Sequence, residues 1–147
     1  MGYTIALLVG LVFWSGVPKA AAHDGPMKVE VVLVWGTSDS TSPDPKHRPV
    51  DPDIDKKLKK LFRWTNYFEV SRKLFTVPET GITNVAVSDK CSVEVRRLTG
   101  SSVEVGYIGK GKPVERRILV LPRDKPLIYG GEAPNATAWF VILRRLE

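Results

Sequence analysis

Apolar and polar residues alternate along the stretch from Cys91 to Leu121, which two glycine-containing turns divide into three runs. Alternation with a period of two places the apolar side chains on one face of a pleated strand. In the first two runs these positions are Cys91, Val93, Val95, Val103, Val105 and Tyr107. The pattern predicts a three-stranded β-meander, with turns near Gly100 and near residues 109–113.

Two further runs are apolar on both faces. Residues 27–35 alternate at first and then become continuously apolar, and Trp139 to Leu143 is apolar at every position. Such strands are buried on both sides, so the second is expected in the middle of a sheet. Shorter extended runs occupy residues 67–77, 83–88 and 127–129. About eight short strands separated by turns predict a mainly β chain that forms an antiparallel β-sandwich of immunoglobulin-like architecture.

One short amphipathic helix is predicted near residues 52–63. Asp51 is a suitable N-cap, and Pro52 suits the first helical position. The stripe expected to pack against the sheet consists of Ile54, Leu58, Leu61 and Phe62. Lysines occupy most of the remaining helix surface, which should face solvent.

The segment that precedes this helix, residues 36–51, is rich in serine, threonine, aspartate and proline. It cannot bury enough apolar surface to form a packed element of its own, so it is expected to be a long loop. Loops of this length in a compact domain are usually functional or disordered. The segment is therefore one candidate location for a site.

Residues 1–22 have the pattern of a signal peptide: an apolar run is followed by small residues, with Ala20 and Ala22 at the −3 and −1 positions. Cleavage near Ala22 would leave residues 23–147 as a single β-sandwich domain. The alternative is a retained membrane anchor, but the apolar run is shorter than the roughly 20 residues that a spanning helix needs. The sequence thus predicts export to a periplasmic, cell-surface or extracellular location, with no transmembrane segment in the mature chain.

Composition and charge narrow the classes of partner. The chain of 147 residues carries a formal net charge of +6, which favours contact with anionic lipid or glycan surfaces. Nucleic acid is not expected as a partner, because no helix-turn-helix or RNA-binding signature is present. With Cys91 as the single cysteine, no intrachain disulfide can form. Its phase with the apolar positions predicts a buried thiol, and an intermolecular disulfide or a redox role is the alternative.

The basic helix and the residues that follow it are the candidate binding surface. Its members are Lys56, Lys57, Lys59, Lys60, Arg63, Trp64, Tyr67 and Arg72. Clustered cations can hold anionic groups, and aromatic residues and arginines are enriched at binding hot spots. An ordinary solvated helix face is the alternative explanation of the lysines.

A metal site is the alternative function. Cleavage after Ala22 would make His23 the first residue, and its terminal amine and imidazole could chelate copper together with His47. This arrangement resembles the histidine brace of secreted polysaccharide monooxygenases and of certain copper-binding β-sandwich proteins. The resemblance implies a copper carrier or an oxidative enzyme, and apart from this alternative no cofactor is expected.

Hydrolytic and calcium-dependent functions are disfavoured. The chain has no Gly-x-Ser-x-Gly motif, and the aspartates from Asp51 to Asp55 depart from a calcium loop at Lys56 and Phe62. The sequence therefore favours an exported, non-catalytic binding or structural module of the cell envelope or extracellular space over an enzyme. A protein partner or self-assembly is the expected mode of action.

Overall fold

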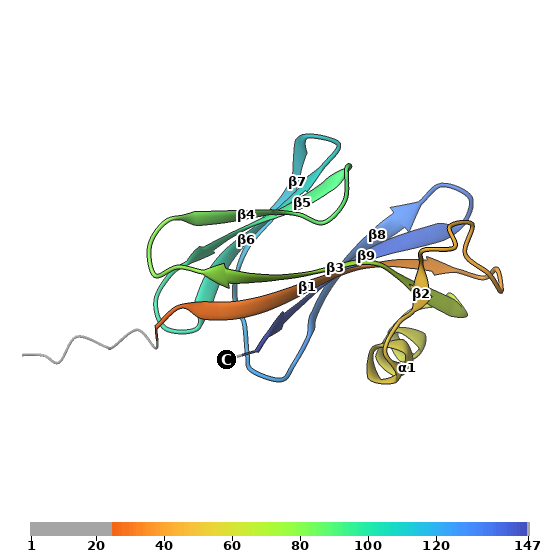
Figure 1. Cartoon of the computed structure of the whole chain (residues 1–147), viewed down its shortest axis with the longest axis horizontal. Helices are drawn as coiled ribbons and strands as arrows, with labels where there is room; N and C mark the ends of the chain where they lie inside the picture. The colour runs from red at the N-terminus through yellow and green to blue at the C-terminus, as the bar shows by residue number, and fades with distance from the viewer. Residues whose placement is uncertain (1–24, 147) are drawn as a thin grey trace, which may run out of the picture.

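The computed structural model describes residues 25–146, which form nine strands and one helix (Figure 1). The predicted signal peptide, residues 1–22, lies outside this part of the chain. The elements are β1 (Met27–Thr37), β2 (Arg48–Pro49), α1 (Pro52–Leu61), β3 (Asn66–Val77), β4 (Ile82–Ala86), β5 (Cys91–Arg97), β6 (Ser102–Gly109), β7 (Lys112–Val120), β8 (Leu127–Ala133) and β9 (Thr137–Arg145).

The strands form two antiparallel sheets that pack together as a β-sandwich, which confirms the predicted fold class (Figure 1). The five-stranded sheet has the order β2-β3-β1-β9-β8, and the four-stranded sheet has the order β4-β5-β6-β7. The predicted meander is the β5-β6-β7 portion of the smaller sheet. Strand β9 lies between β1 and β8 and is buried on both faces, as its continuous apolar run predicts.

The main core fills the space between the sheets. It is built from the apolar positions that alternate along each strand, so inward-facing side chains of the two sheets pack against each other. The fully buried members include Met27, Val29 and Val31 of β1, and Val93 and Val95 of β5. Val103 and Val105 of β6 and Val141 and Leu143 of β9 belong to the same layer.

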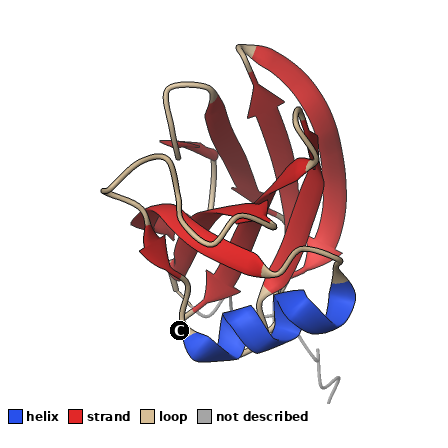
Figure 2. Ribbon diagram, turned by 90° about the vertical axis from the view of Figure 1, so that its right-hand side faces the viewer, coloured by secondary structure: helices blue, strands red, loops and turns tan. Residues whose placement is uncertain are grey.

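A second core lies on the other face of the five-stranded sheet, where α1 covers it (Figure 2). Ile54 and Leu58 of the helix pack there against Val32, Val34 and Phe140 of the sheet. The molecule is therefore layered as small sheet, large sheet and helix, and β1 and β9 contribute side chains to both cores.

Local details around α1 differ from the expectations. The helix ends at Leu61, two residues before the predicted boundary, and Leu61 itself is exposed. Asp51 stands at the N-cap position, but its carboxylate makes no capping hydrogen bond and instead accepts one from Arg72. The expected loop 36–51 is shortened, because β1 continues to Thr37 and β2 pairs with β3.

No helix among residues 25–146 is both long enough and apolar enough to span a membrane.

Candidate ligand-binding site

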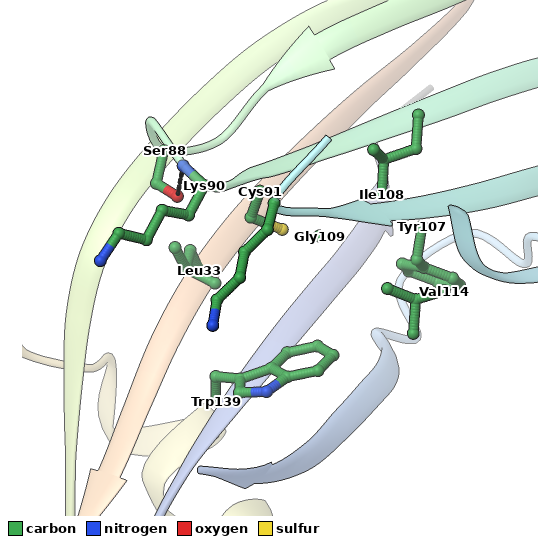
Figure 3. A pocket seen from close by; sticks show the side chains of 10 residues that line it. Leu33, Ser88, Lys90, Cys91, Tyr107, Ile108, Gly109, Val114 and Trp139 are labelled. Atoms are coloured by element: carbon green, nitrogen blue, oxygen red, sulfur yellow. Dashed lines mark hydrogen bonds between the residues drawn. The ribbon is translucent and has the colours of Figure 1, made fainter. Parts of the chain in front are cut away.

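A pocket of about 400 Å³ opens between the two sheets. It lies at the end of the sandwich where the sheets diverge and where the β4–β5 and β6–β7 turns meet (Figure 1). The residues that line it are Leu33, Ser88, Lys90, Cys91, Tyr107, Ile108, Gly109, Lys110, Val114 and Trp139 (Figure 3).

Both sheets contribute apolar walls. Leu33 and Trp139 come from β1 and β9 of the large sheet, and Cys91, Tyr107 and Val114 come from the small sheet. The pocket exists because the sheets differ in length: β1 and β3 have 11 and 12 residues, whereas β4 and β5 have 5 and 7. The large sheet therefore extends beyond its cover, and Trp139 is only half-buried there, whereas Leu33 lies deeper and is buried.

Aromatic contacts hold two of the wall residues in place. The rings of Tyr107 and Tyr129 stack with centroids 3.9 Å apart, and the ring of Trp139 lies 5.6 Å from that of Tyr129. Burial raises the pKa of Tyr107 to about 12. Its phenol is therefore neutral at ordinary pH, and the wall that it forms is uncharged.

A glycine in β8 allows Trp139 to lie flat against the neighbouring strand. A Cβ atom at Gly131 would come within 3.0 Å of Cζ2 of Trp139, so any side chain there would push the indole away. Trp139 is paired with Gly131 in the β8–β9 register, which fixes the indole over this gap.

The thiol of Cys91 is a half-buried part of the wall. Burial raises its pKa, which keeps the thiol protonated and weakly nucleophilic at neutral pH. This position agrees with the expected apolar phase of Cys91. The thiol therefore contributes a soft apolar contact rather than a reactive thiolate.

Two lysines stand at the rim. The backbone N–H of Lys110 donates to the carbonyl oxygen of Lys90 over 2.7 Å, which ties the β6–β7 turn to the β4–β5 turn. Both residues are exposed, and neither takes part in an ion pair within residues 25–146. The arrangement thus combines an apolar interior with two cations that no neighbouring carboxylate neutralises.

The predicted basic surface lies on a different part of the molecule. Lys56, Lys57, Lys59, Lys60 and Arg63 are all exposed along α1 and just after it, on the face of the large sheet that is opposite to the pocket. Lys59 pairs with Asp55 (2.8 Å), and Arg63 pairs with Glu132 (3.1 Å). A role for this surface on anionic lipid or glycan remains a prediction.

Two aromatic residues assigned to the same surface are interior residues. Nε1–H of Trp64 donates to the carbonyl oxygen of Ala136 (2.7 Å). The hydroxyl of Tyr67 donates to the carbonyl oxygen of Leu58 (3.3 Å). Both rings are buried against Phe140 in the helix-side core. They therefore do not form an exposed contact surface, because each polar atom finds a backbone partner that allows its ring to be buried.

Arg72 is enclosed by three carboxylates. It contacts Glu30 (2.7 Å), Glu69 (2.5 Å) and Asp51 (3.0 Å), and thus links β1, β3 and the start of α1. Partial burial by itself would lower the pKa of Arg72, but the hydrogen bonds with these carboxylates raise it above its ordinary value. Its guanidinium therefore has three carboxylate partners within the fold.

The candidate copper ligands are only partly described. Nδ1 of His47 lies 2.7 Å from Oγ of Ser42, and its Nε2 lies 3.7 Å from Oδ2 of Asp44. His23 lies outside the described residues. Among residues 25–146 no three His, Cys, Asp or Glu side chains are grouped as metal ligands, so the brace remains a prediction that depends on His23.

No protein-family model matches this chain, and neither the curated proteins nor the solved structures yield a match. The fold and the pocket by themselves define the class of protein: an antiparallel β-sandwich with an apolar pocket between diverging sheets and a helix packed on the far face of the larger sheet.

Proposed function

We propose that this protein is a non-catalytic binding module that holds an apolar or amphipathic small molecule between its two sheets. The observation that carries the proposal is the pocket of about 400 Å³ with apolar side chains from both sheets. Pockets of roughly 300–1,000 Å³ with mainly apolar walls and a few polar groups are typical of small-molecule sites. The thiol of Cys91 and the phenol of Tyr107 are protonated at neutral pH and suit binding better than acid-base chemistry.

The proposal includes export and action at the cell envelope or outside the cell, as the signal-peptide pattern of residues 1–22 indicates. A carrier or sensor of poorly soluble molecules would act in such a compartment, because apolar molecules are unfavourably hydrated when they cross water between membranes or surfaces. Contact with a protein partner or a second copy is compatible with this role and would use surfaces outside the pocket.

Binding of a neutral fluorescent probe tests the proposed function. N-phenyl-1-naphthylamine is uncharged and fluoresces strongly when it leaves water, so the full-length protein should enhance its emission in a saturable way. Val114→Trp places a large side chain in the pocket and should weaken binding at least about tenfold. Ile118→Trp is the matched control, because Ile118 is an exposed residue of the same strand that does not line the pocket.

Equal probe binding by the wild-type protein and the Val114→Trp variant would refute the pocket as the binding site, and so would an absence of saturable binding. A second readout uses Cys91, which is the only cysteine of the chain and lines the pocket. Occupancy by the probe should slow alkylation of Cys91 by a maleimide. Unchanged alkylation at saturating probe would contradict the proposal.

A further inference from the structure

We infer that the ligand of the pocket is a single-chain amphiphile with an anionic head group, whose carboxylate is held by Lys90 and Lys110 while its alkyl chain lies between the sheets. This inference rests on the proposed function and adds the chemical class of the ligand. Two observations carry it: the charge at the rim and the way in which the backbone holds that charge in place.

The rim of the pocket carries two positive charges and no negative charge. Lys90 and Lys110 both line the pocket, and no lining residue carries a negative charge. Within the described part of the chain neither ammonium group is engaged by a carboxylate, whereas Arg96 of β5 and Arg116 and Arg117 of β7 are paired with glutamates. Two free cations beside an apolar cavity complement an anionic group attached to an apolar body.

The backbone fixes the two lysines relative to one another. The hydrogen bond from the N–H of Lys110 to the carbonyl oxygen of Lys90 joins the turns at one point of the pocket mouth. Because the two lysines are held on adjacent turns, a single carboxylate can contact both ammonium groups when their flexible side chains fold over it. Because the backbone of both turns is already fixed, the entropic cost of forming the site is limited to ordering the two lysine side chains.

The conformation of the β6–β7 turn also supports a binding role for Lys110. Lys110 and Gly111 have φ angles of 52° and 73°, which is the backbone of a type I′ hairpin turn. Asparagine or glycine is favoured at the first of these positions, and a lysine there adopts a backbone that L-residues with long side chains rarely use. A lysine at this position is poorly explained by turn geometry and is consistent with a role for its ammonium group.

The size of the cavity limits the alkyl chain. A volume of about 400 Å³ accommodates about a dozen groups of the size of a water molecule, each of which takes about 30 Å³ in the liquid. A methylene group is of comparable size. A chain of medium length therefore fits, and dodecanoate is a suitable probe.

The test compares three probes of equal chain length as competitors of N-phenyl-1-naphthylamine on the full-length protein: dodecanoate, dodecanol and dodecyltrimethylammonium. Dodecanoate should displace the fluorophore at a concentration about fivefold lower than dodecanol, and the cationic probe should be the weakest. The variant Lys90→Gln/Lys110→Asn should lose this preference while its affinity for dodecanol stays unchanged. Asparagine suits the turn, so loss of folding is not expected to obscure the result.

Lys112→Gln is the matched control, because Lys112 is an exposed lysine of β7 next to the same turn that does not line the pocket. It should retain the preference for dodecanoate. Equal displacement by dodecanoate and dodecanol, or an unchanged preference in the double variant, would overturn the assignment of an anionic head group and leave the apolar pocket in place. Failure of all three probes to displace the fluorophore would overturn both proposals.

Discussion

The two faces of the five-stranded sheet are covered to different degrees, although the same strands supply both. On the helix side, the ring of Phe140 is surrounded by those of Phe62, Trp64 and Tyr67, at centroid distances of 4.6, 5.9 and 5.8 Å. On the other side, the preceding residue, Trp139, borders the pocket, and among residues 25–146 its one ring neighbour is Tyr129. Adjacent residues of β9 therefore face a closed core and an open one.

The difference shows what leaves room for a ligand in a small sandwich. Helix α1 and the residues after it close the helix side, since Phe62, Trp64 and Tyr67 pack around Phe140 of the sheet. The opposite face depends on a sheet of shorter strands, which ends before the long strands do. The two faces therefore differ in how closely their aromatic side chains are packed, and this difference can be tested one residue pair at a time.

The largest expected effect is on the helix side. Phe140→Ala should lower the free energy of unfolding by about 4 kcal/mol, because it leaves a cavity among packed aromatic rings. Trp139→Ala removes a larger but half-buried side chain at the pocket wall and should cost only about 1.5 kcal/mol. Urea unfolding followed by circular dichroism measures both values. Equal costs would show that the two faces are packed equally well.

The ion cluster at the edge of the helix side should give the next largest effect. Arg72→Met should cost about 3 kcal/mol, because the buried Glu30 would lose Arg72 and the buried Glu69 would keep only its longer contact with Arg48 (3.4 Å). Arg63→Met removes an exposed ion pair with Glu132 and should change stability by less than about 0.5 kcal/mol. A cost for Arg72→Met as small as that of the control would contradict a structural role for the cluster.

The strands and the helix follow from periodicities that are local in the sequence, which is why most of them could be predicted. The end of β8 could not. The sequence predicts that the extended run at residues 127–129 ends at Gly130 and Gly131, yet β8 continues through both glycines to Ala133. Their small size is needed because the rings of Phe140 and Trp139 lie against this strand from its two faces. These two rings become neighbours of the glycines only when β9 pairs with β8, and the sequence of β8 alone does not show that pairing.

The candidate site was less predictable for the same reason. An exposed lysine helix is visible in the sequence, whereas the burial of Trp64 and Tyr67 depends on α1 packing onto a sheet that forms elsewhere. The pocket depends on the relative lengths of strands in two sheets, and no single run encodes that difference. A usable signal was the pair Lys110-Gly111, where a lysine occupies a turn position that favours asparagine.

The two glycines of β8 offer a finer comparison between the faces. A Cβ atom at Gly130 would lie 2.3 Å from Cδ1 of Phe140, whose ring is enclosed, so Gly130→Ala should cost about 2 kcal/mol. At Gly131 the nearest atom is Cζ2 of Trp139, at 3.0 Å, and the indole can move toward the pocket. Gly131→Ala should therefore cost less than about 1 kcal/mol and should shift the tryptophan emission. A reversed order in thermal unfolding would contradict the assignment of closed and open faces.

The ion pairs on the outer face of the small sheet should show the smallest effect, since their arginines are exposed to solvent. The carboxylate of Glu104 accepts hydrogen bonds from Arg116 (2.8 Å) and Arg96 (3.0 Å). Its pKa is lowered, chiefly by the bond from Arg116, against a smaller opposing effect of desolvation. Because the pKa is lower in the folded state, the ionised carboxylate stabilises the fold at neutral pH, and this contribution disappears as the pH falls through the lowered pKa.

Glu104→Gln isolates the contribution of this carboxylate, because the amide keeps the shape of the side chain and does not titrate. The difference in unfolding free energy between the wild-type protein and Glu104→Gln should be largest near neutral pH and should shrink toward zero as the solution is made acidic. It should also shrink with added salt, as expected for exposed charges. A difference that stays constant with pH would mean that the arginines do not stabilise the ionised form. The outer face would then contribute charge to the surface without contributing to the stability that the two faces of the large sheet provide.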